Sequence, residues 1–103
     1  MIRHIVFFKF NADVSPAEKE AFADRLRLLE ERIPSVRELT VAFDVGGKPN
    51  AYELALDSVF DSMEDVEVYG AHPDHVAVLA EVKRLCSSTA KVDYPFTPAA
   101  TGR

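Results

Sequence analysis

The chain has 103 residues, which is the length of one ordinary domain. Its 17 Asp and Glu residues outnumber 12 Lys and Arg residues, which gives a formal net charge of −5 with acids and bases interspersed. Without a basic stripe to follow a phosphate backbone, a nucleic-acid partner is not expected. Cys86 is the one cysteine, so an internal disulfide is excluded and a structural role is expected for this thiol.

The N-terminal segment is apolar but short. Residues 1–10 contain His4 and Lys9 and are not followed by a small-residue cleavage site, so they fit neither a signal peptide nor a membrane span. We therefore expect a cytoplasmic location and no membrane partner.

Residues 2–10 predict a first strand, because they are rich in β-branched and aromatic side chains. Apolar residues occupy both parities of this segment, so both faces of the strand are expected to be buried. His4 shares its parity with Val6 and Phe8, which predicts that it enters an apolar layer. A neutral imidazole there needs a hydrogen-bond partner, which we expect from the second helix.

A first helix is predicted to begin at Ser15, since Ser15, Pro16 and Glu18 form a capping-box signature. Pro34 is expected to end it. The apolar stripe of this helix, spaced by three and four residues, consists of Phe22, Leu26, Leu29 and Ile33.

Period-two alternation from Val36 to Val45 predicts a half-buried second strand. Turn-forming residues at 46–50 separate it from a third strand, so these two strands are expected to form a hairpin. The alternating apolar residues of the third strand are Tyr52, Leu54, Leu56 and Phe60.

A second helical stretch begins with a capping signature at Ser62. Gly70 and Pro73 interrupt it, which predicts a short helix, a kink near Ala71–His72, and a longer helix that ends at about Cys86. The apolar side expected for the longer helix consists of Val76, Leu79, Ala80, Val82 and Leu85.

Residues 91–96 predict a last strand, and the element order becomes β-α-β-β-α-β. That order is typical of the ferredoxin-like α+β fold, in which a four-stranded antiparallel sheet carries two helices on one face. Because the first strand is apolar on both parities, we expect the uncovered face to meet the same face of a second copy in a homodimer. The domain is assigned to residues 1–96, and residues 97–103 are expected to form a flexible C-terminal tail.

Five segments occur in an order and spacing that resemble one known family. They are residues 2–10, Ile33-Pro34, residues 59–62, the segment Tyr69-Gly70-Ala71-His72-Pro73-Asp74-His75, and Asp93-Tyr94. The chain resembles the stress-responsive A/B barrel (dimeric α/β-barrel, Dabb) family over residues 1–96, and the Tyr-x-x-His-Pro-x-His segment is the most specific part of the resemblance. The resemblance implies a dimeric α+β barrel. The family includes stress-induced plant proteins, domains attached to other enzymes, and a plant polyketide cyclase that closes an aromatic ring by aldol condensation.

The resemblance to that cyclase implies site residues. Tyr69 and His75 match its tyrosine and its general-base histidine, and His4 matches a pocket histidine on its first strand. Such a ring closure needs a base for an acidic proton flanked by carbonyls and a donor for the developing oxyanion, inside an apolar pocket. An imidazole with an ordinary pKa of about 6.5 suits proton transfer near neutral pH. The residues expected to bind substrate are Phe22, Leu26, Leu56, His72 and Val78.

The histidines also have a plain structural interpretation. His72 and His75 flank Pro73 at a helix break, where polar side chains commonly satisfy helix-end backbone groups. We expect no metal, because the proline interrupts the helical turn between them and no third or fourth ligand follows at a recognisable spacing. The sequence has no Gly-rich phosphate loop and no Lys-centred motif, so no cofactor is expected either.

Two functions remain open from the sequence. The first is a small cofactor-independent enzyme that uses His/Tyr acid-base chemistry on a carbonyl-rich or aromatic metabolite, as a polyketide cyclase does. The alternative is a non-catalytic dimeric module for the stress response or for binding a small hydrophobic or aromatic ligand. A further enzymic reading, oxidation of aromatics by a flavin-free monooxygenase of the wider barrel group, has no motif of its own here.

Overall fold

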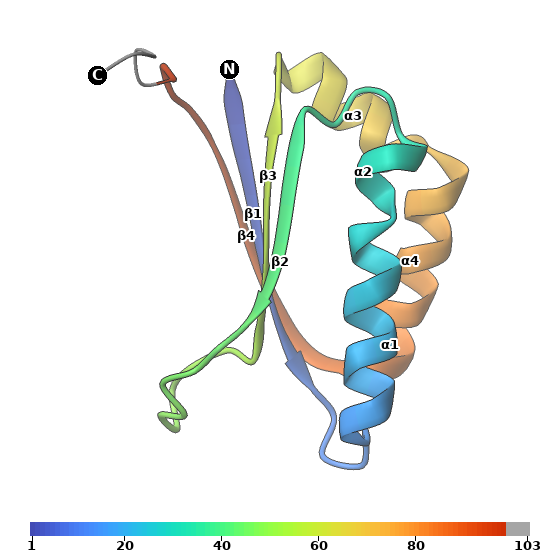
Figure 1. Cartoon of the computed structure of the whole chain (residues 1–103), viewed down its shortest axis with the longest axis vertical. Coiled ribbons are helices and arrows are strands. Elements are labelled where there is room, and N and C mark those ends of the chain that lie inside the picture. The colour runs from blue at the N-terminus through green and yellow to red at the C-terminus, as the bar shows by residue number, and fades with distance from the viewer. Residues whose placement is uncertain (99–103) are drawn as a thin grey trace.

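The computed structural model of the chain describes residues 1–98 (Figure 1). The predicted ferredoxin-like α+β order is confirmed; the second helical stretch is divided in two as predicted, and the first is also divided. The elements are β1 (Ile2–Phe10), α1 (Pro16–Arg27), α2 (Leu29–Arg32), β2 (Glu38–Phe43), β3 (Leu54–Phe60), α3 (Met63–Ala71), α4 (Pro73–Leu85) and β4 (Cys86–Pro95). Residues 97 and 98 carry no regular structure, and the rest of the predicted tail lies outside the described residues. Across residues 1–98, the helices are all too short or too polar to cross a membrane.

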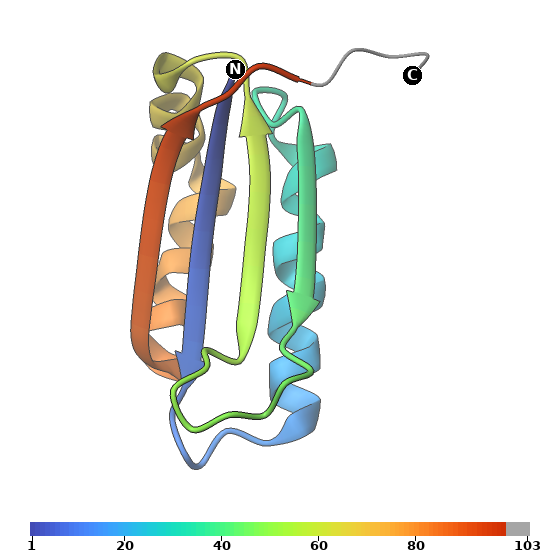
Figure 2. The ribbon, with the colours of Figure 1, turned by 90° about the vertical axis from the view of Figure 1, so that its left-hand side faces the viewer.

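The four strands form one antiparallel sheet in the order β2-β3-β1-β4. Figure 2 looks onto the face of the sheet that no helix covers, and all four helices lie behind it. β1 is a central strand, paired with β3 from Ile2↔Phe60 to Phe8↔Leu54 and with β4 along its whole length. β2 and β3 form the predicted hairpin.

The two faces of β1 have different neighbours. His4, Phe8 and Phe10 face the helices and are buried, as the parity of the sequence predicts. The opposite parity points to the uncovered side, which we call the open face. Its most exposed apolar residues are Phe7 (39% exposed), Val92 (48%) and Tyr94 (39%).

α1 begins as predicted. The Ser15 side chain accepts a hydrogen bond from the Glu18 backbone N–H at 3.2 Å, and the Glu18 carboxylate accepts one from the Ser15 N–H, which completes the capping box. The helix then buries Phe22, whose ring centroid lies 5.4 Å from that of Phe8 and 5.9 Å from that of Phe10. These three rings anchor α1 to the centre of the sheet.

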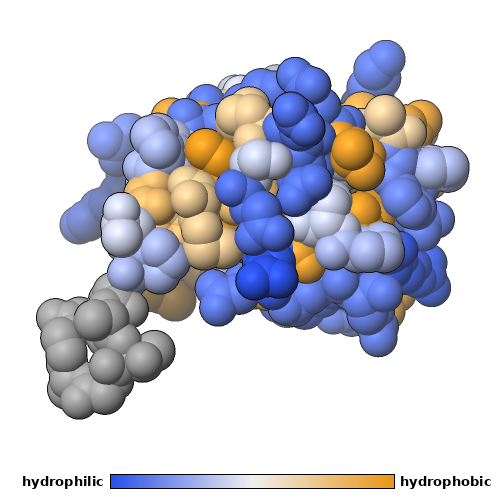
Figure 3. Space-filling view, turned by 90° about the horizontal axis from the view of Figure 1, so that it is seen from above, coloured by the Kyte–Doolittle hydropathy of each residue, from blue (hydrophilic) through white to orange (hydrophobic). Residues whose placement is uncertain are grey.

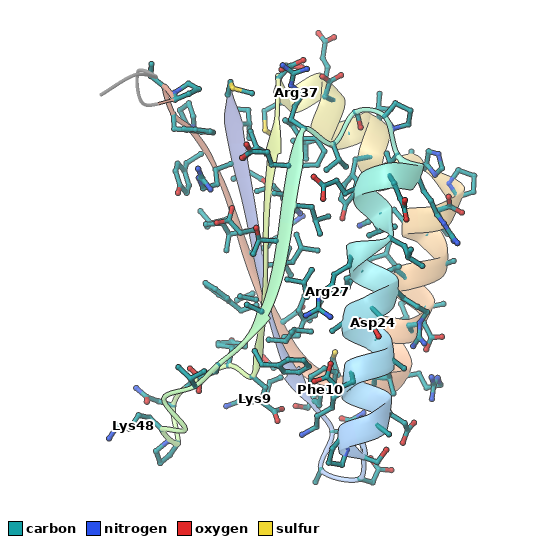
Figure 4. The ribbon with its side chains drawn as sticks, viewed as in Figure 1. Lys9, Phe10, Asp24, Arg27, Arg37 and Lys48 are labelled. Carbon is teal, nitrogen blue, oxygen red and sulfur yellow. The ribbon has the colours of Figure 1, made fainter. Side chains whose placement is uncertain are left out.

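The predicted single helix is divided at Leu28, but the chain keeps its direction. The Leu28 N–H donates to the Asp24 carbonyl and the Arg32 N–H donates to the Leu28 carbonyl, both at 3.2 Å, so α2 continues the path of α1. The side chain of Arg27 points from α1 toward the sheet (Figure 4), where it donates to the Val41 carbonyl of β2 at 3.1 Å. This bond partly satisfies the free edge of β2.

β2 is shorter than predicted and ends at Phe43, so Val45 is fully exposed. The turn starts one residue after the strand, because the Asp44 carboxylate accepts a hydrogen bond from the Gly47 N–H at 2.9 Å. Gly47 has φ 66°, a left-handed conformation that glycine adopts without steric cost. The connection between β2 and β3 therefore extends beyond the turn-forming residues 46–50. Tyr52, which is predicted in the third strand, lies in this connection and precedes β3.

The predicted kink is confirmed at His72, which has ψ 137° and separates α3 from α4. The predicted apolar side of α4 is partly wrong: Val76, Leu79 and Ala80 are exposed, and Val78 is buried instead. Both patterns share Val82 and Leu85, and the spacing alone did not fix the rotation of the helix about its axis.

β4 is longer than predicted and begins at Cys86 rather than at residue 91. Phe10 of β1 pairs with Cys86, so β4 is extended along the full length of its neighbour. Tertiary pairing therefore overrides the weak strand propensity of Ser87 and Ser88.

Replacing Phe22 by Ala is expected to lower the free energy of unfolding by about 3–5 kcal/mol, because it leaves a cavity between Phe8 and Phe10. Urea unfolding followed by circular dichroism measures this loss. Val68→Ala on the exposed side of α3 serves as the matched control and should change stability by about 0.5 kcal/mol or less. A loss for Phe22→Ala as small as that of the control would contradict the anchoring role of the three rings.

Candidate active site

An apolar cavity of about 180 Å³ lies between the sheet and the helices. We call it the inner cavity. The sheet lines it with Val6, Phe8 and Leu56. The helices line it with Leu26, Val78, Leu79 and Val82. An apolar cavity of about 150 Å³ binds benzene in another protein, so this one is large enough for a single aromatic ring or a short alkyl chain.

Four polar side chains meet at one end of the inner cavity: His4, Tyr69, His75 and Lys91. They come from β1, α3, α4 and β4 respectively. The ring centroids of Tyr69 and His75 are 4.4 Å apart, and those of His4 and Tyr69 are 6.0 Å apart. The structure thus brings the three predicted catalytic residues to one place, although their catalytic roles stay a prediction.

The break between α3 and α4 sets the positions of Tyr69 and His75. Because the chain turns at His72, the two rings lie on separate helices that meet at an angle. The Nδ1 atom of His75 lies 3.0 Å from the carbonyl oxygen of Gly70 and donates a hydrogen bond to it across the break. In the neutral ring this leaves Nε2 as the nitrogen that can accept a proton.

Burial shifts the pKa values of these two groups in opposite directions. The pKa of His75 is lowered from its ordinary value, mainly by burial; the hydrogen bond to the Gly70 carbonyl opposes this shift, and electrostatic interactions with His4 and Lys91 add to it. Burial also raises the pKa of Tyr69 to about 12. At neutral pH, His75 is therefore an unprotonated base and Tyr69 keeps its proton. The Tyr69 hydroxyl makes no hydrogen bond to any other side chain or backbone group of residues 1–98, which leaves it free to donate to a ligand.

His4 takes its hydrogen-bond partner from β4, not from the second helix as predicted. Its Nδ1 donates to the carboxylate of Asp93, which lies directly opposite it in the sheet register. The Ser58 hydroxyl on the other neighbouring strand donates to the His4 carbonyl at 3.0 Å. A strand position determines this partnership, because residues opposite one another in neighbouring strands point to the same side of the sheet.

The predicted substrate-binding residues divide into two groups. Leu26, Leu56 and Val78 line the inner cavity. Phe22 does not line it, since its ring is fully buried between Phe8 and Phe10. His72 does not line it either: its Nδ1 accepts a hydrogen bond from the Asp74 N–H at 3.1 Å and caps α4. The contacts of His72 therefore support its role as a helix cap and not as a substrate-binding residue.

The His-x-x-His pair has its Nδ1 atoms engaged with backbone groups, His72 with an amide and His75 with a carbonyl. Among residues 1–98, no three His, Cys, Asp or Glu side chains gather closely enough to hold a metal ion.

Sequence reasoning missed Lys91 and Asp93 as site residues. The two residues are two positions apart in β4, so their side chains point to the same face of the sheet. The register of β4 against β1 places Lys91 opposite Val6 and Asp93 opposite His4. Their alternation was visible in the sequence, but the face that they occupy depends on a register that only pairing with β1 defines.

A second cavity, of about 330 Å³, lies beside the inner one, and we call it the outer cavity. It shares His4, Tyr69, His75 and Lys91 with the inner cavity and adds more exposed residues of α3, including Met63 and Glu67. The surface at this end of the molecule is mostly hydrophilic with apolar patches (Figure 3). The four shared side chains therefore lie at the junction between an apolar interior and a wetter exterior.

Comparisons with known proteins agree with this architecture. A protein from Streptomyces coelicolor is 33% identical over 98 residues, which are 93% of this chain and 100% of that protein. Olivetolic acid cyclase from Cannabis sativa is 29% identical over 77 residues, covering 73% of this chain and 76% of the cyclase. A solved structure of a dimeric protein with a ferredoxin-like fold from Bacteroides fragilis has a TM-score of 0.79 and 34% identity, over 92% of this chain and 95% of that one.

The family described as the Stress responsive A/B Barrel Domain (Dabb) matches residues 2–96. This range includes every helix and strand of the described part of the chain and the four residues at the cavity junction. This chain belongs to the stress responsive A/B barrel domain family.

Proposed function

We propose that this chain is a small cofactor-independent enzyme in which His75 removes a proton beside a carbonyl group and Tyr69 stabilises the oxyanion that forms. The observation that carries the proposal is the 4.4 Å approach of the two rings at the end of an apolar cavity. Their opposite pKa shifts support it, because a base and a donor of hydrogen bonds need opposite protonation states at the same pH.

The hydrogen bond of His75 Nδ1 to the Gly70 carbonyl determines which ring nitrogen takes part in the proposed proton transfer. Nε2 of His75 accepts the proton as the C–H bond breaks, and the electron pair moves onto the carbonyl oxygen to give an enolate. The Tyr69 O–H donates a hydrogen bond to that oxygen. In an aldol closure, the enolate carbon then attacks a second carbonyl of the same molecule, and the His75 imidazolium returns the proton to the new alkoxide.

The cavity favours a carbonyl-rich or aromatic metabolite as the substrate. Its volume of about 180 Å³ and its aliphatic and aromatic walls suit one ring or a short chain. The similarity to olivetolic acid cyclase supports the same class of chemistry, with Tyr69, His75 and His4 in the roles that the family resemblance implies. His4, held by Asp93, is a second imidazole within reach of the same space.

We also infer that the chain is a homodimer joined through its open faces. Phe7, Val92 and Tyr94 leave an apolar surface on that side of the sheet, which a second copy would cover. The 34% identical Bacteroides fragilis protein, which is dimeric, supports this assembly. Residues of the open face, such as Val92, therefore offer a test of this interface.

The alternative function is a non-catalytic dimeric module that binds a small hydrophobic or aromatic ligand. The backbone hydrogen bonds of His72 and His75 favour it, since both rings stabilise the helix break whether or not a reaction takes place. The inner cavity serves either function, and loss or retention of turnover in variants of His75 distinguishes them.

Phenylacetone is a suitable probe of the proposed chemistry, because it has one aromatic ring and acidic C–H groups beside a carbonyl. Exchange of its methylene protons for deuterium, followed by NMR, should be faster with the protein than without it. We expect His75→Ala to remove about 100-fold or more of the acceleration and Tyr69→Phe to remove a comparable share. Sedimentation and circular dichroism should show both variants folded and dimeric. Full acceleration with His75→Ala would reject His75 as the base and favour the binding module.

The pH dependence of the same exchange reaction should follow the lowered pKa of His75. A base is active when unprotonated, so the enzymic rate should be level at neutral pH and fall at acidic pH, with a midpoint below the ordinary imidazole value of 6.5. Because the pKa of Tyr69 is raised to about 12, no loss from its deprotonation is expected at moderately alkaline pH. Rates corrected for the spontaneous reaction test this, and a midpoint above 6.5 would contradict the assigned environment.

Val92→Lys should dissociate the dimer, because it places a charge within the apolar surface that Phe7, Val92 and Tyr94 form on the open face. Sedimentation equilibrium should give twice the 11.5 kDa chain mass for the unaltered protein and a lower mass for the variant at the same concentration. Val68→Lys, on the exposed side of α3, is the control and should remain dimeric. A monomeric unaltered protein at micromolar concentration would refute the inferred assembly.

A further inference from the structure

We propose that Lys91 makes the site selective for an anionic ligand, specifically a small aromatic or short-chain carboxylate whose carboxylate group pairs with the Lys91 ammonium. The inference rests on the proposed function for the location of the site. It adds the charge of the ligand, which neither the fold nor the His/Tyr pair determines.

The placement of Lys91 is the first observation. It lies opposite Val6 in the register of β4 against β1, and so on the helix side of the sheet. Its side chain lines both the inner and the outer cavity, together with the two rings of the proposed base and donor. The side chain itself is exposed, which lets the apolar stem lie along the cavity rim while the ammonium stays hydrated in the free protein.

The second observation is that this cation has no anionic partner. Among residues 1–98, no carboxylate lies within salt-bridge distance of the Lys91 ammonium. The carboxylates of Asp93 and Glu67 line the outer cavity together with Lys91, but that of Asp93 is engaged with His4 and neither pairs with the lysine. The positive charge of Lys91 reaches across the junction to His75 and contributes to the lowering of its pKa. The junction therefore carries a positive charge that the protein itself does not neutralise by direct contact.

The third observation is the contrast between this charge and the walls beside it. Seven of the residues that line the inner cavity are aliphatic or aromatic hydrocarbons, and they offer no partner for a charged ligand group. A carboxylate attached to an apolar group would bury the apolar part in the inner cavity and keep its charge at the junction. A single lysine matches the single charge of a carboxylate, and the ring-sized volume limits the apolar part.

Phenylacetate and its uncharged analogue phenylacetamide test the charge preference without any need for turnover. Dissociation constants from NMR titration of the protein should show phenylacetate binding about two- to fivefold more tightly, the size expected of an ion pair at a solvent-exposed rim. Lys91→Met should remove this preference while retaining the affinity for phenylacetamide, and Lys91→Arg should keep it. Lys83→Met, which removes an exposed charge on α4 away from both cavities, is the matched control and should behave as the unaltered protein.

Equal affinities for the two probes, or binding of neither, would overturn the proposal. So would a preference that survives in Lys91→Met or disappears equally in Lys83→Met, since the effect would then come from net charge rather than from this site. The result is separable from the proposed function. A carboxylate preference that depends on Lys91 in a protein without exchange activity would support this inference and reject the proposed enzyme. Exchange activity in a protein without the preference would support the enzyme and reject this inference.

Discussion

The register of β1 is the constraint on which the rest of the molecule depends. This strand pairs along nearly its whole length with β3 on one side and β4 on the other. A slip of one residue would exchange its two faces, moving His4 and Phe8 away from the helices and turning Phe7 into the core. The aromatic contacts that hold α1, the partnership of His4 with Asp93, and the apolar character of the open face all require the same register.

The break between α3 and α4 places two more side chains on the site that β1 creates. Proline at the first position of α4 lacks the N–H that a continuous helix would need there, and His72 caps the new helix with its own ring. His75 then closes the break by its hydrogen bond to the Gly70 carbonyl. The same bond stabilises the helix break and would orient the ring for the proposed proton transfer, because fixing one ring nitrogen leaves the other as the proton acceptor.

Burial at the cavity junction changes the pKa values of the side chains there as well as stabilising the fold. A low-polarity environment disfavours the charged form of any group, so it lowers the pKa of His75 and raises that of Tyr69 without requiring a separate device for each. Lys91 reaches the junction from the solvent-exposed rim, where its ammonium stays hydrated. One boundary between apolar and aqueous surroundings thereby holds a neutral base, a neutral donor and a cation close together.

The sequence by itself determined the order of elements, the capping of α1, the kink at His72 and the inward parity of His4, because each depends on residues close together in the chain. The resemblance carried by the Tyr-x-x-His-Pro-x-His segment also identified Tyr69 and His75, which the structure brings together. Only the tertiary structure decided that Asp93 is the partner of His4, that Lys91 reaches the cavity, and that Phe22 belongs to the core and not to the site. It also decided the rotation of α4, which left Val76 exposed, and the full length of β4. The physical reason is the same in each case: periodicity gives the spacing of a face, whereas strand register and helix packing between distant segments decide what that face meets.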